Sequence, residues 1–354
     1  MERTRIARIA PLNSAWLKSV AHEAGFDLAG VASVTPDLDF PLYKEWTEQG
    51  RAGKMGYLTD KRADMRRDPR ALLPAARSIL CVGKLYNGPQ PYTGQVSDER
   101  LGWISRYAWG EDYHPLMKSG LERVVANLQQ SSAKPFDYKI CVDTSPLLER
   151  SYARQAGLGW IGRNTCLIHQ GKGSWFFLAE LLTSLDLEPD TPPPDRCGTC
   201  TRCIDACPTQ ALIPGESGRF TLDARLCISY FTIELRGDIP EPHRTGMGRH
   251  LFGCDICQDV CPWNSKAGQD GDPSYQPRHF APPLAEMAAL SEEGFRSAFQ
   301  GTPVTRARYT GFLRNVAVAM GNSGQAEFAA PLRKLAAHPD PVVASHAVWA
   351  LSQL

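Results

Sequence analysis

Residues 197–208 read Cys197-Gly-Thr-Cys200-Thr-Arg-Cys203-Ile-Asp-Ala-Cys207-Pro208, and residues 254–262 read Cys254-Asp-Ile-Cys257-Gln-Asp-Val-Cys261-Pro262. A single cysteine, Cys227, stands between the two runs. The first run has the spacing C-x2-C-x2-C-x3-C-P, in which three cysteines hold one [4Fe-4S] cluster and the fourth ligates its neighbour. We therefore predict two [4Fe-4S] clusters. One is held by Cys197, Cys200, Cys203 and Cys261, and the other by Cys207, Cys227, Cys254 and Cys257.

Zinc is the alternative for these cysteines, because C-x2-C pairs also form tetrahedral zinc sites. A zinc site needs neither three cysteines in successive two-residue steps nor the Cys-Pro crossovers. The spacing therefore favours the two clusters.

Length and composition predict an ordinary globular protein. The chain has 354 residues and a net charge of +1, which suits two or three domains and leaves any nucleic-acid contact to local patches. The first residues, Met1 to Ile6, lack the apolar segment of an export signal, and the most apolar stretch, 175–185, is too short to cross a membrane. Eleven cysteines without an export signal indicate metal ligands in a reducing, cytoplasmic setting.

The region before the cysteines alternates short apolar runs with helical patterns. Strands are expected at 28–34, 78–85 and 138–142, and helices at 13–25, 112–130 and 146–156. This alternation predicts an α/β domain over residues 1–190. A proline-rich linker at 189–195 then leads into a ferredoxin-like two-cluster domain at 191–265.

The C-terminal region, 283–354, is expected to be helical, and residues 339–351 resemble a helix of a HEAT-type repeat. Only one or two such units fit, fewer than a free-standing solenoid needs, so the helices must dock on the rest of the protein. The predicted fold class is thus α+β and multi-domain.

The clusters alone would suit a ferredoxin-type electron carrier or a structural-cluster RNA-binding protein. The additional domains suggest instead an electron acceptor within the same chain. Neither a G-x-G-x-x-G turn after a strand nor a P-loop is present, so flavin and nicotinamide receive no support. The cobalamin motif D-x-H-x-x-G begins at Asp112 and His114 but fails at Met117.

Several motifs besides the cysteines resemble those of the epoxyqueuosine reductase family, and the likeness runs from about residue 13 to the C-terminus. They are Ser105–His114, Val142–Arg150, Gly159–Asn164, Cys227–Leu235 and Gly311–Asn322. The resemblance implies a base-off cobalamin, reduced through the clusters, that removes the epoxide oxygen of epoxyqueuosine at the tRNA wobble position. It also implies an external one-electron donor such as a flavodoxin or ferredoxin. A second corrinoid possibility is a dehalogenase-like reductase of small molecules. Nothing in the sequence demands a dimer, so a monomer is expected.

Asp143 follows the expected strand 138–142, and the resemblance makes it the catalytic proton donor beside the cofactor. Epoxide opening leaves an alkoxide that must be protonated, which is a task for a positioned acid. The alternative is structural: Asp143-Thr-Ser-Pro146 could cap the following helix, with proline at its first position.

Further cofactor contacts follow from the resemblance, with Gly162 and Asn164 added as possible backbone-amide donors to the corrin. The set is Arg62, Ser105, Gly162, Asn164, Leu167, Leu178, Ser229, Asp255 and Ile256. For the two leucines the alternative is plain core packing. The candidate tRNA phosphate contacts are Arg236, Arg306, Arg308 and Arg314, the last three because the tail from Thr302 carries five basic against two acidic residues.

Overall fold

The structure, a computed structural model, describes residues 13–215, 218–269 and 271–354. The expectation that Met1 to Ile6 hold no export signal lies outside these residues. Among the helices described, none combines the length and apolar character needed to cross a membrane.

A four-stranded antiparallel sheet forms the centre of the N-terminal region. In spatial order its strands are β1 (Leu28–Ser33), β2 (Ser78–Leu85), β7 (Phe176–Thr183) and β4 (Tyr138–Cys141). Each adjacent pair is antiparallel, so the prediction of an α/β domain from the alternating pattern is wrong in this respect, and the fold is α+β. Strand β7 accounts for two of these three pairs, because it lies between β2 and β4 although it follows both in the sequence, and β1 pairs with β2 in antiparallel directions independently of it.

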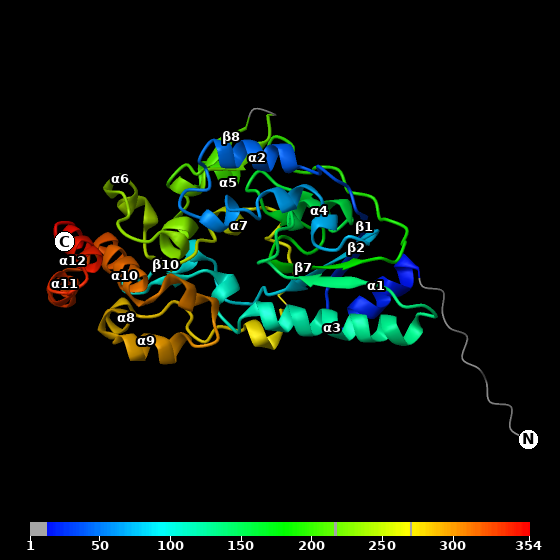
Figure 1. Cartoon of the computed structure of the whole chain (residues 1–354). Coiled ribbons are helices and arrows are strands. Elements are labelled where there is room, and N and C mark those ends of the chain that lie inside the picture. Colours follow the sequence, from blue (N-terminus) through cyan, green and yellow to red (C-terminus); the bar gives the residue numbers. More distant parts are fainter. Residues whose placement is uncertain (1–12, 216–217, 270) are drawn as a thin grey trace, which may run out of the picture.

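The two faces of the sheet are covered by different helices because strand side chains alternate in direction. Leu80 and Val82 of β2 pack against α1 (Ser14–Glu23) and α3 (Tyr113–Ser131). Ile79 and Cys81 face the opposite way, toward α4 (Glu149–Gln155). Figure 1 shows α1 and α3 running along one side of the sheet with α4 on the other.

Helices α1 and α3 lie within two residues of the predicted ranges 13–25 and 112–130. Asn13 caps α1 through the backbone N–H of Trp16 at 2.9 Å, and Asp112 caps α3. The third helix starts later than predicted, at Glu149 rather than at Pro146. Its N-cap position is Leu148, so the alternative role of Asp143 as a helix cap is wrong.

The remaining elements are short and surround the cysteines. The helices are α2 (Phe40–Glu48), α5 (Arg202–Asp205), α6 (Glu241–Arg244) and α7 (Ile256–Asp259). The strands are β3 (Trp103–Ile104), β5 (Trp160–Ile161), β6 (Leu167–Ile168), β8 (Leu212–Pro214), β9 (Phe220–Leu222) and β10 (His250–Phe252). Strand β3 pairs in parallel with β10, so the N-terminal and cysteine-containing regions share a sheet.

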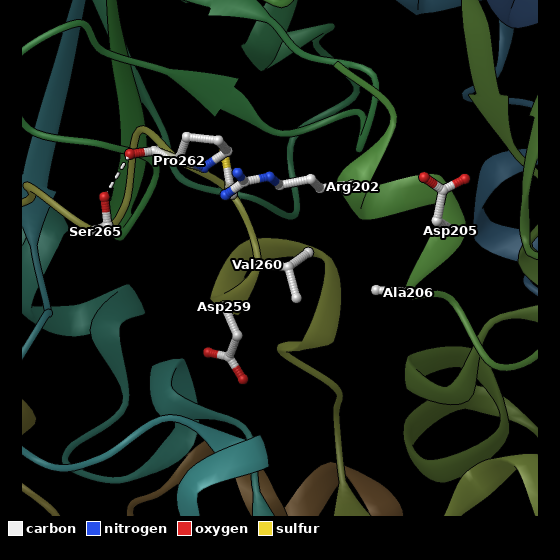
Figure 2. A pocket seen from close by; sticks show the side chains of 8 residues that line it. Arg202, Asp205, Ala206, Asp259, Val260, Pro262 and Ser265 are labelled. Atoms are coloured by element: carbon white, nitrogen blue, oxygen red, sulfur yellow. Dashed lines mark hydrogen bonds between the residues drawn. The ribbon is translucent and has the colours of Figure 1, made fainter.

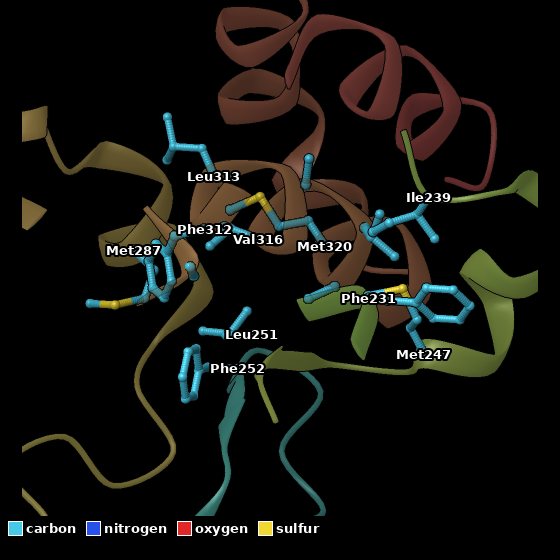
Figure 3. Close-up of a cluster of buried hydrophobic side chains, with 14 of the residues drawn as sticks. Phe231, Ile239, Met247, Leu251, Phe252, Met287, Phe312, Leu313, Val316 and Met320 are labelled. Atoms are coloured by element: carbon cyan, nitrogen blue, oxygen red, sulfur yellow. The ribbon is translucent and has the colours of Figure 1, made fainter. Parts of the chain in front are cut away.

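Five helices form the C-terminal tail. They are α8 (Leu284–Ala289), α9 (Glu292–Phe299), α10 (Tyr309–Ser323), α11 (Ala329–Ala336) and α12 (Pro341–Leu351). A short 3-10 turn, Pro303–Ala307, precedes α10 and is separated from it at Arg308, whose φ is +60°. Helix α10 is the central one, and Figure 3 shows Phe312, Val316 and Met320 packed in one cluster with residues of the cysteine-containing region. The tail thus docks on the rest of the protein, as expected.

Candidate functional site

The predicted cluster ligands fall into two groups in space. The first is Cys197, Cys200, Cys203 and Cys261, and the second is Cys207, Cys227, Cys254 and Cys257. Burial and the three neighbouring sulfurs of its group raise the pKa of Cys203 to about 11. Burial and nearby sulfurs of the second group likewise raise the pKa of Cys254. Thiols gathered this closely are costly to ionise unless a positively charged core lies between them, and an iron–sulfur cluster supplies such a core.

Among residues 13–215, 218–269 and 271–354, no group of three or more His, Cys, Asp or Glu side chains is placed to hold a single metal ion. The choice between two clusters and zinc therefore rests on the spacing of the cysteines.

A hollow of about 610 Å³ lies beside Cys261, between α5 and the end of α7. Figure 2 shows the side chain of Arg202 reaching across it toward Pro262, with Asp205 and Asp259 on its borders. The first cysteine group therefore adjoins an open part of the surface.

A larger cleft of about 1320 Å³ lies between the sheet region and the cysteine-containing region. Its walls include Asp143 from the end of β4, Gly162 from the β5–β6 turn and Gly198 from the first cysteine loop. Arg163 of that turn donates to the carbonyl of Gly198 at 2.7 Å, which fixes the cysteine loop to this wall. Ligand pockets usually measure roughly 300–1,000 Å³, so this cleft suits an unusually large ligand.

Asp143 has a left-handed backbone conformation, with φ of +51°, in a tight turn where Thr144 N–H donates to Val142 O at 2.5 Å. Its own N–H donates to the carboxylate of Glu149 at 2.7 Å. Its carboxylate Oδ2 lies 3.3 Å from Nε2 of His114. The side chain is thus directed into the cleft and held by a charged partner, not used to cap α4.

His114 connects Asp143 to Asp112, whose Oδ1 lies 2.7 Å from its Nδ1. Asp112 first, and then Asp143, raise the pKa of His114 to about 9. The imidazole therefore carries a proton at neutral pH. The sequence placed Asp112 and His114 in a failed cobalamin motif and gave no sign that His114 reaches a residue 29 positions away.

Of the predicted cofactor contacts, Arg62, Asp143 and Gly162 line the large cleft. Arg62 is half-buried and forms an ion pair with Asp60 at 2.9 Å. The backbone-amide role for Gly162 is wrong, because its N–H donates to the carbonyl of Cys166 at 2.9 Å. The side chain of Asn164 bonds the Cys257 carbonyl at 3.3 Å and the Cys166 amide at 3.2 Å, so it holds the turn in place.

Other predicted contacts lie behind the cleft wall. Leu167 is buried, and Leu178 packs beside it, in the core beneath α4. Ser105 and Asp255 are both buried and bonded to each other; Asp255 also accepts the Arg106 N–H at 2.7 Å. Both side chains are thus engaged inside the protein. Ser229 adjoins the Cys227 thiol, and Ile256 opens α7 among the cluster ligands.

The predicted tRNA arginines divide into two kinds. Arg236, Arg306 and Arg308 are exposed, and Arg306 lines the cleft, where it pairs with Glu234 at 2.8 Å. The prediction for Arg314 is wrong. Arg314 is 1 % exposed and its guanidinium donates to the carbonyls of Phe231, Leu235 and Gly237, because α10 is buried on all sides.

Sequence reasoning also missed the aromatic part of the cleft, which includes Tyr43, Trp46, Tyr57, Tyr107 and Tyr113. Tyr57 is 38 % exposed and lies 5.5 Å from the Arg306 guanidinium carbon. Helix α2, which supplies Tyr43 and Trp46, was not predicted, although proline at its start is a usual signal.

Two four-cysteine groups, the first with its loop on the wall of a large cleft that also holds a positioned carboxylate, define an iron–sulfur oxidoreductase. Residues 196–264 match the family described as a 4Fe-4S double cluster binding domain, and residues 66–144 match "Epoxyqueuosine reductase QueG, DUF1730". The chain belongs to the epoxyqueuosine reductase family.

Its relatives are similar over nearly their whole length. The epoxyqueuosine reductase of Xanthomonas campestris pv. campestris is 39% identical, over 98% of both chains. A crystal structure of an epoxyqueuosine reductase with an epoxyqueuosine-modified tRNA-Tyr stem loop has a TM-score of 0.85 at 30% identity, over 96% of this chain and 89% of that one. A structure from Bacillus subtilis, with its catalytic aspartate loop swung out of the active site, has a TM-score of 0.84 at 29% identity over the same shares.

Proposed function

We propose that this enzyme reduces epoxyqueuosine to queuosine in the anticodon loop of tRNA, using a base-off cobalamin in the large cleft and electrons delivered through two [4Fe-4S] clusters. The observation that carries the proposal is that Asp143 and the first cysteine loop, at Gly198, line one cleft. Converting the epoxide to an alkene consumes two electrons and two protons and releases water. The substrate must therefore lie within reach of both a proton donor and an electron donor. A substrate in this cleft would have Asp143 on one wall and the first cysteine loop on another.

The cleft fits a corrin in size and lining. Its volume exceeds that of ordinary ligand pockets, and it offers aromatic faces together with polar side chains such as Arg62. Cobalamin, when bound, would supply the low-potential reductant for the epoxide. We propose that Arg62 and the aromatic residues of α2, Tyr43 and Trp46, hold it. The buried Ser105 and Asp255, Leu167 and Leu178, and the neighbouring Asn164, Ser229 and Ile256 would support its site from behind.

Asp143 would donate the proton that the opened epoxide oxygen requires. The adjacent His114, protonated at neutral pH, supports this role because it holds the Asp143 side chain in place and keeps a proton on the hydrogen bond between the two residues at the cleft. The Bacillus subtilis relative has a catalytic aspartate on a loop that can leave its active site. We propose that the turn at Asp143 is the corresponding loop.

The tRNA would approach over the rim formed by Arg236, Arg306 and Arg308. Proteins read single-stranded loops by stacking unpaired bases on aromatic side chains and by contacting phosphates. The exposed Tyr57 beside Arg306 offers both kinds of contact at the cleft mouth. The structure of a relative with an epoxyqueuosine-modified tRNA stem loop supports the proposal that this enzyme acts on the same kind of substrate.

We further propose three functional regions: a cobalamin-binding region over 1–190, a two-cluster ferredoxin-type region over 191–265 and a HEAT-like tail over 283–354. The enzyme would work as a cytoplasmic monomer. A flavodoxin or ferredoxin would deliver single electrons, with the hollow beside Cys261 as its nearest access to the first cluster.

The test is turnover by the enzyme reconstituted without oxygen. Wild type, with clusters, cobalamin and a chemical reductant, should convert an epoxyqueuosine stem loop to the queuosine form, followed by nucleoside mass spectrometry. Asp143→Asn should retain its clusters and bind the stem loop but lose turnover. Full turnover by this variant would exclude Asp143 as the acid.

A further inference from the structure

A buried carboxyl lies under the turn that carries Asp143. Glu180, in the centre of β7, is 0 % exposed and is flanked across the sheet by Cys81 of β2 and Cys141 of β4. No hydrogen-bond donor among the described residues reaches either of its carboxylate oxygens. Because an isolated buried carboxylate is strongly disfavoured, Glu180 must itself carry a proton. Burial first, and then Glu149, raise its pKa well above the usual range.

The group next to Glu180 is the carboxyl of Glu149, at the first position of α4. Two carboxyl groups in contact repel when both are ionised, and they form a strong hydrogen bond when one proton lies between them. Burial and the nearby Asp143 raise the pKa of Glu149 to about 7. A proton on Glu180 would therefore be in a position to be donated to Glu149.

Glu149 connects this pair to the cleft. Its Oε1 accepts the backbone N–H of Asp143 at 2.7 Å. That backbone has φ of +51°, a conformation that a non-glycine residue keeps only where its surroundings impose it. Arg150, next along α4, donates to the carbonyl of Thr165 and so anchors the start of the helix to the β5–β6 turn.

We propose that Glu149 and Glu180 share one proton and act as a latch that holds the Asp143 turn in its cleft-facing conformation. Glu149 is the positioning residue, because it bonds the Asp143 amide. Glu180 keeps Glu149 oriented by donating to it. Only the effect of the latch on catalysis rests on the proposed function. The latch itself concerns the resting protein and can be tested without substrate.

The first test needs no substrate. Hydrogen–deuterium exchange of peptides spanning 142–148 should be about tenfold faster in Glu149→Ala than in wild type, because the Asp143 amide loses its acceptor. Glu149→Gln keeps an acceptor oxygen and should restore slow exchange. Glu122→Ala, on the exposed face of α3, is the matched control and should leave this peptide unchanged. Equal exchange in wild type and Glu149→Ala would overturn the latch.

The second test detects the shared proton. Infrared spectroscopy of the resting protein should show a protonated, buried carboxyl band at pH 8 that Glu180→Gln removes. The isosteric amide still donates to Glu149, so this variant should fold and keep slow exchange at 142–148. Absence of the band in wild type would overturn the shared proton.

In turnover, Glu149→Ala should lower kcat about tenfold with an unchanged KM for the stem loop, and Glu149→Gln should recover most of the loss. An active wild type whose kcat is unaffected by Glu149→Ala would overturn the positioning role alone. An inactive wild type would instead count against the proposed function, since the exchange and infrared results do not depend on it.

Discussion

Replacing Arg314 tests whether the tail arginines act in folding or in RNA binding. Arg314 donates to three buried backbone carbonyls and to the Asn315 side chain, at 2.9 Å from Nη1 to Leu235 O and 2.6 Å to Gly237 O. Arg314→Met keeps the length of the side chain and removes every donor. Each carbonyl loses a hydrogen bond to a charged group, worth about 1.5–3 kcal/mol.

An opposing effect reduces this loss. Burial lowers the pKa of Arg314 from 12.5 to about 10, so keeping its charge inside costs about 3 kcal/mol, and methionine removes that cost. The variant loses three hydrogen bonds but no longer bears the cost of burying a charge. The free energy of unfolding should therefore fall by about 3 kcal/mol. At about 1.3 °C per kcal/mol for a chain of 354 residues, the melting temperature should fall by about 4 °C. Arg314→Lys should recover little, because an ammonium cannot match the guanidinium fork.

The assay is thermal unfolding followed by circular dichroism at a fixed scan rate, in parallel with stem-loop binding across a salt series. Arg308→Met is the matched control. Arg308 is exposed, so the Arg308→Met variant should melt near the temperature of wild type. The slope of the logarithm of its stem-loop binding constant against the logarithm of the salt concentration should fall by about one, as for the loss of one phosphate contact. The reasoning is refuted if Arg314→Met melts with wild type and instead weakens stem-loop binding.

Three further predictions concern the clusters, the proton donor and the RNA. Cys203→Ala and Cys254→Ala should each lower iron and acid-labile sulfide by about half, because they fall in different cysteine groups, whereas Cys141→Ala should leave both unchanged; an equal loss in all three would contradict the two groups. The folded pKa of His114 is raised from 6.5 to about 9, so its stabilising effect is fully present below pH 6.5 and is lost as pH rises through about 9. Since the partner carboxylates are about 40 % exposed, we expect about 1 kcal/mol, and His114→Asn should remove this pH dependence of the unfolding temperature; a persisting dependence would assign it elsewhere. Tyr57→Ala should weaken stem-loop binding by about 1–3 kcal/mol and Tyr57→Phe should not, measured by fluorescence anisotropy, and equal losses in both would exclude base stacking.

Local features of this fold could be predicted from the sequence because they depend on neighbouring residues. Strand β2 has the predicted bounds, and the caps of α1 and α3 are Asn13 and Asp112 as their residue types indicate. The cysteine groups are also predictable, although their members are far apart in the sequence, because the spacing C-x2-C-x2-C-x3-C-P shows which cysteine ligates the other cluster.

Long-range features could not be predicted in this way. The place of β7 between β2 and β4 depends on sheet pairing between distant segments, and so the antiparallel topology was missed. Glu149 lies on α4 and Glu180 on β7, and these two elements are not consecutive in the sequence. Their proximity therefore depends on how the helix packs on the sheet. Arg314 had a signal: the residues around it, 312–320, are apolar on every side of the helix, which indicates burial whatever the helix phase.

The most direct test of the account is a single-turnover experiment on cluster-loaded enzyme with and without added cobalamin. With cobalamin and excess reductant, one equivalent of epoxyqueuosine stem loop should lose its epoxide oxygen while two electrons are consumed, and omission of cobalamin should abolish the product. Equal product without cobalamin, or an intact epoxide in the fully loaded and reduced enzyme, would contradict the account.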